Sequence, residues 1–383
     1  MNLVQHFTEV RAYTEAICQP LTTEDHQVQA ASFASPAKWH LAHTTWFFET
    51  FVLLPYMPGY EVFHSDFNFL FNSYYNHAGE RVARTHRGSI TRPGVQKVYE
   101  YRAYVNGAMS RFIKDTPEEE VCNLITLGIH HEQQHQELLL TDIKYMLWQN
   151  PLFPLYHADT RLLDNERNEK QGFVSVEAGV YDIGFQDTGF CYDNELGVHK
   201  VYLHDFEIDQ GLITNGEYLE FINDGAYSNF DVWLDEGWSW VRENNIGAPL
   251  YWRFIDGEWH QFTLKGLQRV VPDEIVKHIS FYEAAAFAEW KGMRLPTEFE
   301  WEVAAQKLHW GKRWEWTNSA YLPYPNFSRA KGAVGEYNGK FMINQMVLRG
   351  ASIATSPNHG RKTYRNFFHP NYQWQFTGIR LVK

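Results

Sequence analysis

One long amphipathic segment decides the class of the fold: residues 119–149, EEVCNLITLGIHHEQQHQELLLTDIKYMLWQ. Its apolar residues recur at helical spacing along the whole stretch, which predicts a single long helix. Thr116 and Pro117, directly before it, supply an N-cap residue and a proline at the first helical position, and Glu119 stands three residues after the cap. Pro151 ends the pattern, because the residue before a proline disfavours the helical conformation.

Three further segments in the first 150 residues carry the same spacing: Leu3–Gln19, Pro36–Leu54 and Gly94–Asp115. Four such helices predict a four-helix bundle over residues 1–150, with any metal or ligand site on the inward faces. The connection between the second and third helices, residues 55–93, is long for a compact domain, and loops of that length are usually functional.

The composition and the residue pattern of the chain change after the predicted bundle. Residues 151–171 are polar and charged and predict a linker, whereas residues 172–383 contain short strand-like segments, many Gly and Trp residues and long irregular stretches. Two short helices are expected there: one over residues 279–292, and one that begins at Thr297 with a capping box to Glu300. The predicted fold class is therefore α+β, in two domains.

The overall composition of the chain argues against several classes of function and partner. The 383 residues suffice for two domains that each bury a core. A net charge of -12 without a basic run makes nucleic acid and anionic membrane surfaces poor partners. Three scattered cysteines, Cys18, Cys122 and Cys191, imply no disulfide framework. The N-terminus lacks a signal-peptide core, and no apolar run reaches the length of a membrane span, so a cytoplasmic location is expected.

Two histidines four residues apart, His131 and His135, stand on one face of the long predicted helix, where both can bind one metal ion. The same stretch, residues 131–135, matches the zinc-protease pattern H-E-x-x-H, in which Glu132 would be the general base. A protease needs a further ligand downstream, and Glu137 follows His135 too closely to share its helix face. We therefore favour a metal site of another kind.

A third ligand is expected from the second helix, where His40 and His43 are three residues apart and either could point inward. A lone histidine in a core is usually satisfied by a neighbouring carbonyl or carboxylate, but histidine pairs on two bundle helices favour a metal. Three neutral imidazoles leave up to three positions open on an octahedral metal. Zinc would use one for water, whereas iron(II) could take two substrates and O2, and the imidazoles alone do not distinguish these metals.

At this point the chain resembles the ergothioneine-biosynthesis sulfoxide synthases. The resemblance rests on six motifs in order: WHLAHTTWFFE (39–49), HHEQQHQELLLTDIKY (130–145), RLPTEFEWEVAA (294–305), WEWTNSAYLPYP (314–325), LRGAS (348–352) and YRNFFHPNYQWQFTGIRL (364–381). It implies a DinB-like four-helix bundle followed by a formylglycine-generating-enzyme-type domain with a C-type-lectin-like fold. It also implies non-haem iron(II) as the cofactor and O2 as a substrate.

The resemblance assigns roles to single residues. It makes His43, rather than His40, the third iron ligand beside His131 and His135. It assigns Gln134 and Asn366 to the histidine-betaine substrate hercynine, with amide groups that can hydrogen-bond its polar atoms. Arg84 and Arg87 resemble the arginines that hold the carboxylate of the thiol substrate.

A tyrosine is also expected at the iron. Tyr74 and Tyr75 resemble a pair that one branch of the family brings from the bundle, where a phenol could donate a proton during oxygen reduction. Other members supply a tyrosine from the second domain; here Tyr337 remains, but the expected position holds Val334. Phe368 and Tyr372 replace charged positions of members that use γ-glutamylcysteine, which favours free cysteine as the sulfur donor.

The predicted function is thus an iron(II)- and O2-dependent synthase that joins cysteine to C2 of the hercynine imidazole as a sulfoxide. Sister activities on the same scaffold are the alternatives: sulfoxide synthesis on histidine, as in ovothiol formation, or use of a selenium donor. From other classes, a zinc-dependent DinB-like thiol transferase or hydrolase remains open. A formylglycine-generating oxidase is opposed by the cysteine count, because the second domain contains Cys191 alone.

Overall fold

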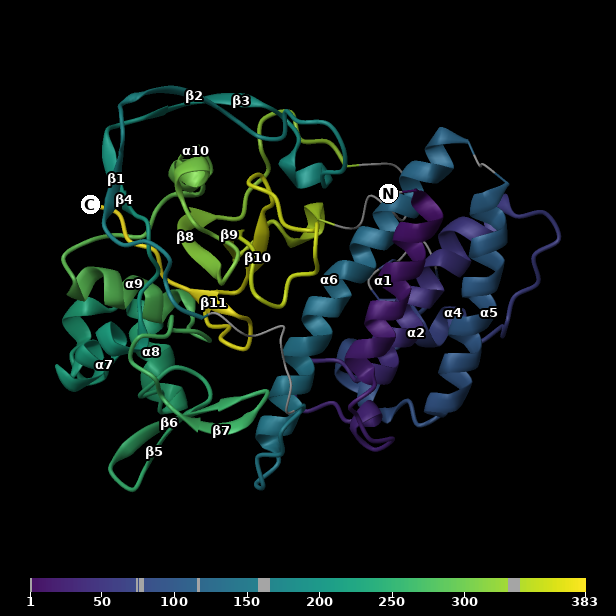
Figure 1. Ribbon diagram of the computed structural model, residues 1–383, viewed down its shortest axis with the longest axis horizontal. Helices are drawn as coiled ribbons and strands as arrows, with labels where there is room; N and C mark the ends of the chain where they lie inside the picture. Colours follow the sequence, from purple (N-terminus) through teal and green to yellow (C-terminus); the bar gives the residue numbers. More distant parts are fainter. Residues whose placement is uncertain (1, 74, 76–78, 116–117, 158–165, 330–337) are drawn as a thin grey trace. The chain divides into compact units, whose positions relative to one another are not determined.

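The structure is a computed structural model that describes residues 2–73, 75, 79–115, 118–157, 166–329 and 338–383. The chain forms two compact units (Figure 1). The first contains the N-terminal residues up to His157 together with Thr355–His359, a short segment from far along the chain, and the second contains the rest of the described residues.

Four long helices build the first unit: α1 (Leu3–Cys18), α2 (Ala37–Phe48), α5 (Val95–Lys114) and α6 (Glu119–Gln149). Helix α1 packs against α5 and α6, and α2 packs against the same two helices, as expected of a four-helix bundle (Figure 1). These are the four helices that the apolar spacing predicts. All 12 residues of α2 are buried, so this helix forms the centre of the unit.

The helix ends differ from the sequence prediction in two places. Helix α6 begins at Glu119 with Glu118 as its N-cap residue, and the expected cap at Thr116–Pro117 lies outside the described residues. Helix α2 continues through a π-helical turn, Glu49–Leu53, into the short α3 (Leu54–Tyr56), past the predicted end at Leu54. The long connection that follows contains α4 (Phe67–Phe71) and a 3-10 helix, Arg84–Ser89.

A glycine on α6 permits the close approach of α2. A Cβ atom at Gly128 would lie 2.6 Å from a ring carbon of Phe48 and 2.8 Å from one of Phe47, shorter than side-chain contacts tolerate. The two aromatic rings therefore occupy the space that any other residue would need. Gly128 thus lets Phe47 reach α6 one turn before the histidine pair.

The second unit combines small antiparallel sheets with short helices. Its largest sheet has the order β10-β9-β8-β11, in which only β11 runs parallel to its neighbour β8. The strands of this sheet are β8 (Trp314–Ala320), β9 (Met346–Gly350), β10 (Asn366–Phe368) and β11 (Thr377–Gly378). Three smaller sheets pair β1 (Phe173–Val176) with β4 (Phe206–Asp209), β2 (Gly179–Ile183) with β3 (His199–Leu203), and β5 (Trp252–Ile255) with β6 (Glu258–Thr263) and β7 (Gly266–Arg269).

Four helices complete this unit: α7 (Asn215–Asn223), α8 (Asp235–Asn244), α9 (Phe281–Trp290) and α10 (Glu298–Ala304). Helices α9 and α10 are the two that the sequence predicts. The capping box of α10 forms as expected, because Thr297 accepts from the Glu300 N–H and the Glu300 carboxylate accepts from the Thr297 N–H.

The core of the second unit is aromatic and contains charge pairs. The indole N–H of Trp301 donates to Glu315, whose carboxylate also pairs with Arg380 at 2.6 Å. Removing either partner of such a buried pair would destabilise the unit, because it would leave an uncompensated buried charge. The α+β class, with a helical first unit and a sheet-containing second unit, is confirmed. Within the described residues, no helix is both long enough and apolar enough to cross a lipid bilayer.

Candidate metal centre

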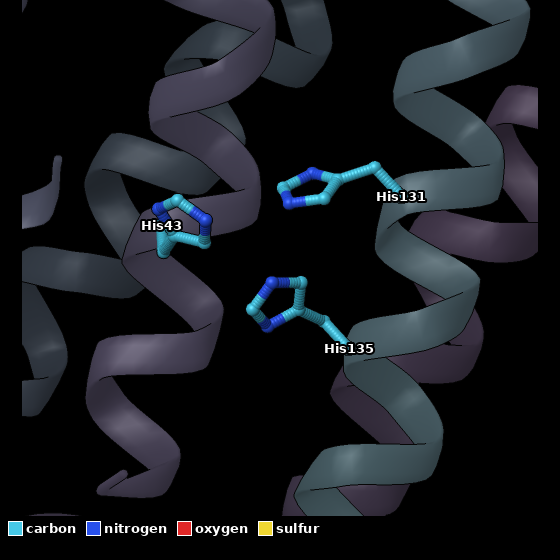
Figure 2. A group of neighbouring side chains, drawn as sticks. All are labelled: His43, His131 and His135. Atoms are coloured by element: carbon cyan, nitrogen blue, oxygen red, sulfur yellow. The ribbon is translucent and has the colours of Figure 1, made fainter. Parts of the chain in front are cut away.

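Three histidines from two helices of the first unit meet in its interior. His43 comes from α2, and His131 and His135 come from α6. Each offers a ring nitrogen, and these nitrogen atoms lie within 4.8 Å of one another. Figure 2 shows the three rings pointing toward one another across the space between the two helices. All three side chains are buried, so a metal ion held there would be shielded from bulk water.

The ring of His43 is held in one plane and one tautomer. It is stacked between the indoles of Trp39 and Trp46, with ring centroids 4.4 Å and 5.4 Å away. Its Nδ1 lies 2.7 Å from the carbonyl oxygen of Phe71, so Nδ1–H donates and Nε2 keeps its lone pair. This buried Nε2 has no hydrogen-bond partner among the described residues, as expected of an atom that is available to a metal.

Burial keeps the three imidazoles neutral. It lowers the pKa of His43 and of His135 well below the ordinary value, and the neighbouring histidines lower them further. Burial also lowers the pKa of His131, to about 3, although Glu132 opposes this shift. Neutral imidazole is the form that binds metal ions, so no proton has to be displaced from these rings at neutral pH. The donor set therefore fits a divalent metal that accepts nitrogen ligands.

His40, which the sequence left as an alternative to His43, also points inward but occupies a different place. Its Nδ1 lies 2.9 Å from Nδ1 of His135, and its Nε2 lies 3.1 Å from the Asp142 carboxylate. Both ring nitrogens of His40 are thus occupied by protein partners. The residue stands behind a member of the cluster and does not belong to it.

Glu132, between the two α6 histidines in sequence, points into an ionic cluster of the bundle core. Its carboxylate accepts hydrogen bonds from Arg11 at 2.7 Å, from Thr14 at 2.6 Å, and from Arg102. Burial alone would raise its pKa, but the guanidinium groups of Arg102 and Arg11 and the hydrogen bonds lower it to about 2. A carboxylate held in this way is a poor proton acceptor, so the geometry opposes the zinc-protease interpretation.

Glu137, two residues after His135, contacts the segment Thr355–His359 from far along the chain. The Thr355 hydroxyl donates to its carboxylate at 2.9 Å. On the preceding turn of α6, the Gln133 amide donates to the carbonyl of Pro357 at 3.2 Å. Glu137 thus holds this segment on the helix that carries His131 and His135, and it is not one of the three clustered groups.

The tyrosine pair is described only in part. Tyr75 is buried and packs against Trp46 and Phe51, with ring centroids 5.6 Å and 5.2 Å away. Trp46 in turn stacks on His43, so Tyr75 belongs to the aromatic shell around the cluster. Tyr74, Val334 and Tyr337 lie outside the described residues.

The two arginines of the long connection differ in their surroundings. Arg84 is exposed at the start of the 3-10 helix. Arg87 is buried, with its guanidinium carbon 3.4 Å from the ring centroid of Trp39, and it donates to the hydroxyls of Ser35 at 2.9 Å and Ser73 at 2.8 Å. Arg87 therefore supports the indole that stacks on His43, a contact that the sequence does not reveal.

The two amides predicted for hercynine lie in different units. Gln134 is on α6, half-buried, next to His135. Asn366 begins β10 in the second unit, where its side-chain oxygen accepts from the N–H of Phe367 at 2.9 Å. Their roles, like those of Tyr74, Tyr75, Arg84 and Arg87, stay predictions.

Comparison with known proteins agrees with this architecture. Residues 6–139 match the family model of the DinB superfamily, and residues 159–312 match that of the sulfatase-modifying factor enzyme 1-like domain. The hercynine oxygenase of Mycolicibacterium smegmatis is 28% identical, in an alignment that covers 74% of this chain and 76% of the relative. That of Mycolicibacterium thermoresistibile is 27% identical and covers 91% and 87%. The chain is a homologue of the hercynine oxygenases.

The second domain of the chain is also similar to that of another group of proteins. The formylglycine-generating enzyme of Streptomyces coelicolor is 30% identical, over 38% of this chain and 50% of the relative. The similarity concerns the domain type, because the present chain has a single cysteine, Cys191, after residue 122. The two-domain resemblance that the motifs predict is therefore confirmed.

Several residues of this chain that contact the clustered histidines or their neighbours were not predicted from the sequence. The spacing Trp39, His43, Trp46 follows one helix face and could have suggested two indoles around an imidazole. Asp142 follows His135 by two helical turns and could have been assigned to the same face. By contrast, nothing in the local sequence identifies the Phe71 carbonyl as the partner of His43, because that contact depends on how the long connection folds back.

Proposed function

We propose that this chain is an iron(II)- and O2-dependent sulfoxide synthase that joins the sulfur of cysteine to C2 of the hercynine imidazole. The observation that carries the proposal is the buried group of three neutral histidines, in a chain homologous to hercynine oxygenases over most of its length. Iron(II) is the proposed metal because the reaction consumes O2, and three imidazoles leave room for both substrates and O2.

The overall reaction balances without a further reductant. The thiol loses its S–H hydrogen and the imidazole C2 loses its hydrogen, a C–S bond forms, one oxygen atom of O2 becomes the sulfoxide oxygen, and the other leaves as water. When bound, the iron would activate O2 and hold both substrates within bonding distance. O2 accepts four electrons: two are released when the S–H and C2–H bonds are replaced by the C–S bond, and two when the sulfur is oxidised to the sulfoxide.

The residues of the chain would orient the partners and control protons. His43, His131 and His135 would hold the metal, and the stacked indoles of Trp39 and Trp46 fix the His43 ring and keep water out. We assign Gln134 and Asn366 to hercynine and Arg84 and Arg87 to the cysteine carboxylate. Tyr75, or its neighbour Tyr74, would donate a proton from its hydroxyl during oxygen reduction and recover one from the substrates.

Cysteine is preferred to γ-glutamylcysteine as the proposed sulfur donor. A γ-glutamyl group adds a second carboxylate and an amine, which need charged partners near the C-terminus. The side chains at the corresponding positions are Phe368 and Tyr372, which offer neither charge. The larger donor therefore finds fewer partners in this chain.

Turnover by anaerobically reconstituted protein tests the proposal. We expect protein loaded with iron(II) and mixed with hercynine, cysteine and O2 to yield hercynylcysteine sulfoxide with one O2 consumed per product, measured by mass spectrometry and an oxygen electrode. Histidine and γ-glutamylcysteine, each replacing one substrate, should give kcat/KM values lower by roughly ten-fold or more, the discrimination that a few lost contacts supply.

The same measurements decide between the alternatives. A preference for histidine as acceptor, or for a selenium donor, would contradict the substrate assignment and leave the reaction class intact. Tightly bound zinc together with thiol transfer or hydrolysis in the absence of O2 would contradict the proposal altogether, in favour of a zinc-dependent DinB-like enzyme.

Replacing Tyr75 by phenylalanine tests the proton-donor role. The variant should bind iron(II) as well as the original protein but form sulfoxide about 10²–10⁴-fold more slowly, because it keeps the ring and loses only the hydroxyl. Tyr74→Phe is measured in parallel. Tyr101→Phe is the matched control: Tyr101 is equally buried in the bundle, but its hydroxyl donates to Glu49. Normal sulfoxide rates in both the Tyr74 and Tyr75 variants would disprove the role.

A further inference from the structure

A continuous hydrogen-bonded chain connects a buried carboxylate to one member of the histidine cluster. Asp142 Oδ2 lies 3.1 Å from Nε2 of His40, and Nδ1 of His40 lies 2.9 Å from Nδ1 of His135. All three side chains are buried, with side-chain exposures of 3% for His40 and 5% for Asp142. Solvent therefore has no part in these two contacts.

The scaffold holds both ends of this chain on one helix. Asp142 and His135 stand on α6, two turns apart on the same face, and His40 bridges between them from α2. The backbone N–H of Ser35, just before α2, donates to the same Asp142 oxygen at 2.9 Å, which fixes the carboxylate in place. The contacts thus run from α6 to α2 and back to α6.

The chemistry of the two contacts leaves one arrangement of protons. An ionised carboxylate only accepts hydrogen bonds, so Nε2 of His40 must carry the hydrogen of the first contact. Nδ1 of a neutral His40 then has a lone pair and accepts, so Nδ1 of His135 must carry the hydrogen of the second. A neutral His135 with hydrogen on Nδ1 has its lone pair on Nε2.

We propose that His40 and Asp142 are positioning residues that fix His135 as the tautomer and rotamer whose Nε2 binds the metal. Ligating histidines commonly donate their second ring N–H to a carboxylate or carbonyl, which orients the ring and increases its basicity. For His43 this partner is the Phe71 carbonyl. For His135 it is a second imidazole, which carries the effect of the Asp142 carboxylate to the ligand. The inference rests on the proposed metal centre and not on the sulfoxide chemistry.

Two substitutions at His40 separate positioning from packing. His40→Leu fills similar space but provides no acceptor for Nδ1–H of His135. His40→Asn restores an acceptor, because its side-chain oxygen stands at the same number of bonds from the backbone as Nδ1 of histidine. His359→Leu is the matched control: His359 makes a comparable Nδ1 to Nδ1 contact of 3.0 Å with His130 on α6, and neither residue belongs to the three-histidine group.

The measurement uses Co(II) as the probe metal, bound to the whole chain under anaerobic conditions without substrates. Competition with a chelator should show Co(II) binding weakened about 10–100-fold in His40→Leu, largely restored in His40→Asn, and unchanged in His359→Leu. Proton NMR of the Co(II) protein should show a paramagnetically shifted N–H resonance of His135 that exchanges slowly with solvent. This resonance should shift or disappear in His40→Leu and persist in His40→Asn.

The outcomes distinguish this inference from the proposed function. Co(II) affinity within two-fold of the original protein in His40→Leu, with the N–H resonance unmoved, overturns the positioning role, whatever happens to the melting temperature. Equal losses in His40→Leu and His40→Asn overturn it as well, since restoring the acceptor then restores nothing. If Co(II) binding follows the expected pattern but the protein makes no sulfoxide, the positioning role of His40 is supported. In that case only the proposed function is refuted.

Discussion

Replacing His135 by alanine is expected to abolish tight iron(II) binding and, with it, sulfoxide formation. The variant keeps only His43 and His131 of the three clustered nitrogens. Because loss of a mere supporting contact weakens metal binding about 10–100-fold, loss of a ligand should exceed that range. The metal retained after anaerobic gel filtration, together with the dissociation constant from chelator competition, measures the effect.

A neighbouring histidine provides the control for this result. His130 stands on the same helix but faces His359, outside the three-histidine group. His130→Ala should therefore retain one iron per chain. If His135→Ala binds iron(II) as tightly as the original protein, the cluster is not the metal centre, and both the proposed function and the role of His40 fail with it.

The largest expected loss of stability comes from Glu132→Ala. The substitution leaves the buried guanidinium groups of Arg11 and Arg102 without the carboxylate that both contact. Breaking a buried ion pair by removing one partner costs about 3–5 kcal/mol. Hydrogen exchange of α6 peptides, followed by mass spectrometry on the whole chain, should show a decrease of this size in the local free energy of opening.

The matched control is Glu49, a second buried glutamate of the bundle whose hydrogen-bond donors are uncharged. Its carboxylate accepts from the hydroxyls of Tyr60 and Tyr101 and from the N–H of Phe63. Glu49→Ala should cost about 1–3 kcal/mol, less than Glu132→Ala. Equal losses in the two variants would contradict the ionic explanation.

The acid dependence follows from the same carboxylate. Because the folded pKa of Glu132, about 2, lies below the ordinary value of 4.5, its contribution to stability is present above pH 4.5. That contribution should be lost as the pH falls from 4.5 toward 2, where the unfolded chain takes up the proton first. Glu132→Ala should lack this part of the acid transition.

Local patterns predicted the parts of the fold and site that depend on local geometry. Apolar spacing identified the four bundle helices, and the spacing of four between His131 and His135 placed both on one helix face. The spacing of three between His40 and His43 could not assign their roles, because both point inward. What separates them is Asp142 for one and the Phe71 carbonyl for the other, each from another part of the chain.

The surroundings of Glu132 could not be predicted for the same reason. The charge of the Glu132 carboxylate is compensated by Arg11 and Arg102, which come from two other helices. No pattern in residues 131–135 predicts these partners. The packing of Arg87 against Trp39 could not be predicted either, because it depends on how the long connection folds back onto α2. In the second unit, β10 and β11 span only three and two residues, too short for an alternating pattern to mark them.

The contact between Thr355 and Glu137 has a consequence for the order in which the site is assembled. The two residues are 218 positions apart, so the ribosome completes all four bundle helices well before it makes Thr355. At about 5–20 residues per second, this delay is on the order of ten to forty seconds. During synthesis the bundle can therefore fold and bring its three clustered histidines together before the segment Thr355–His359 exists to contact α6. A chain that ends before Thr355 would contain all three clustered histidines. It would still lack the segment that contacts Glu137 and Gln133 on α6.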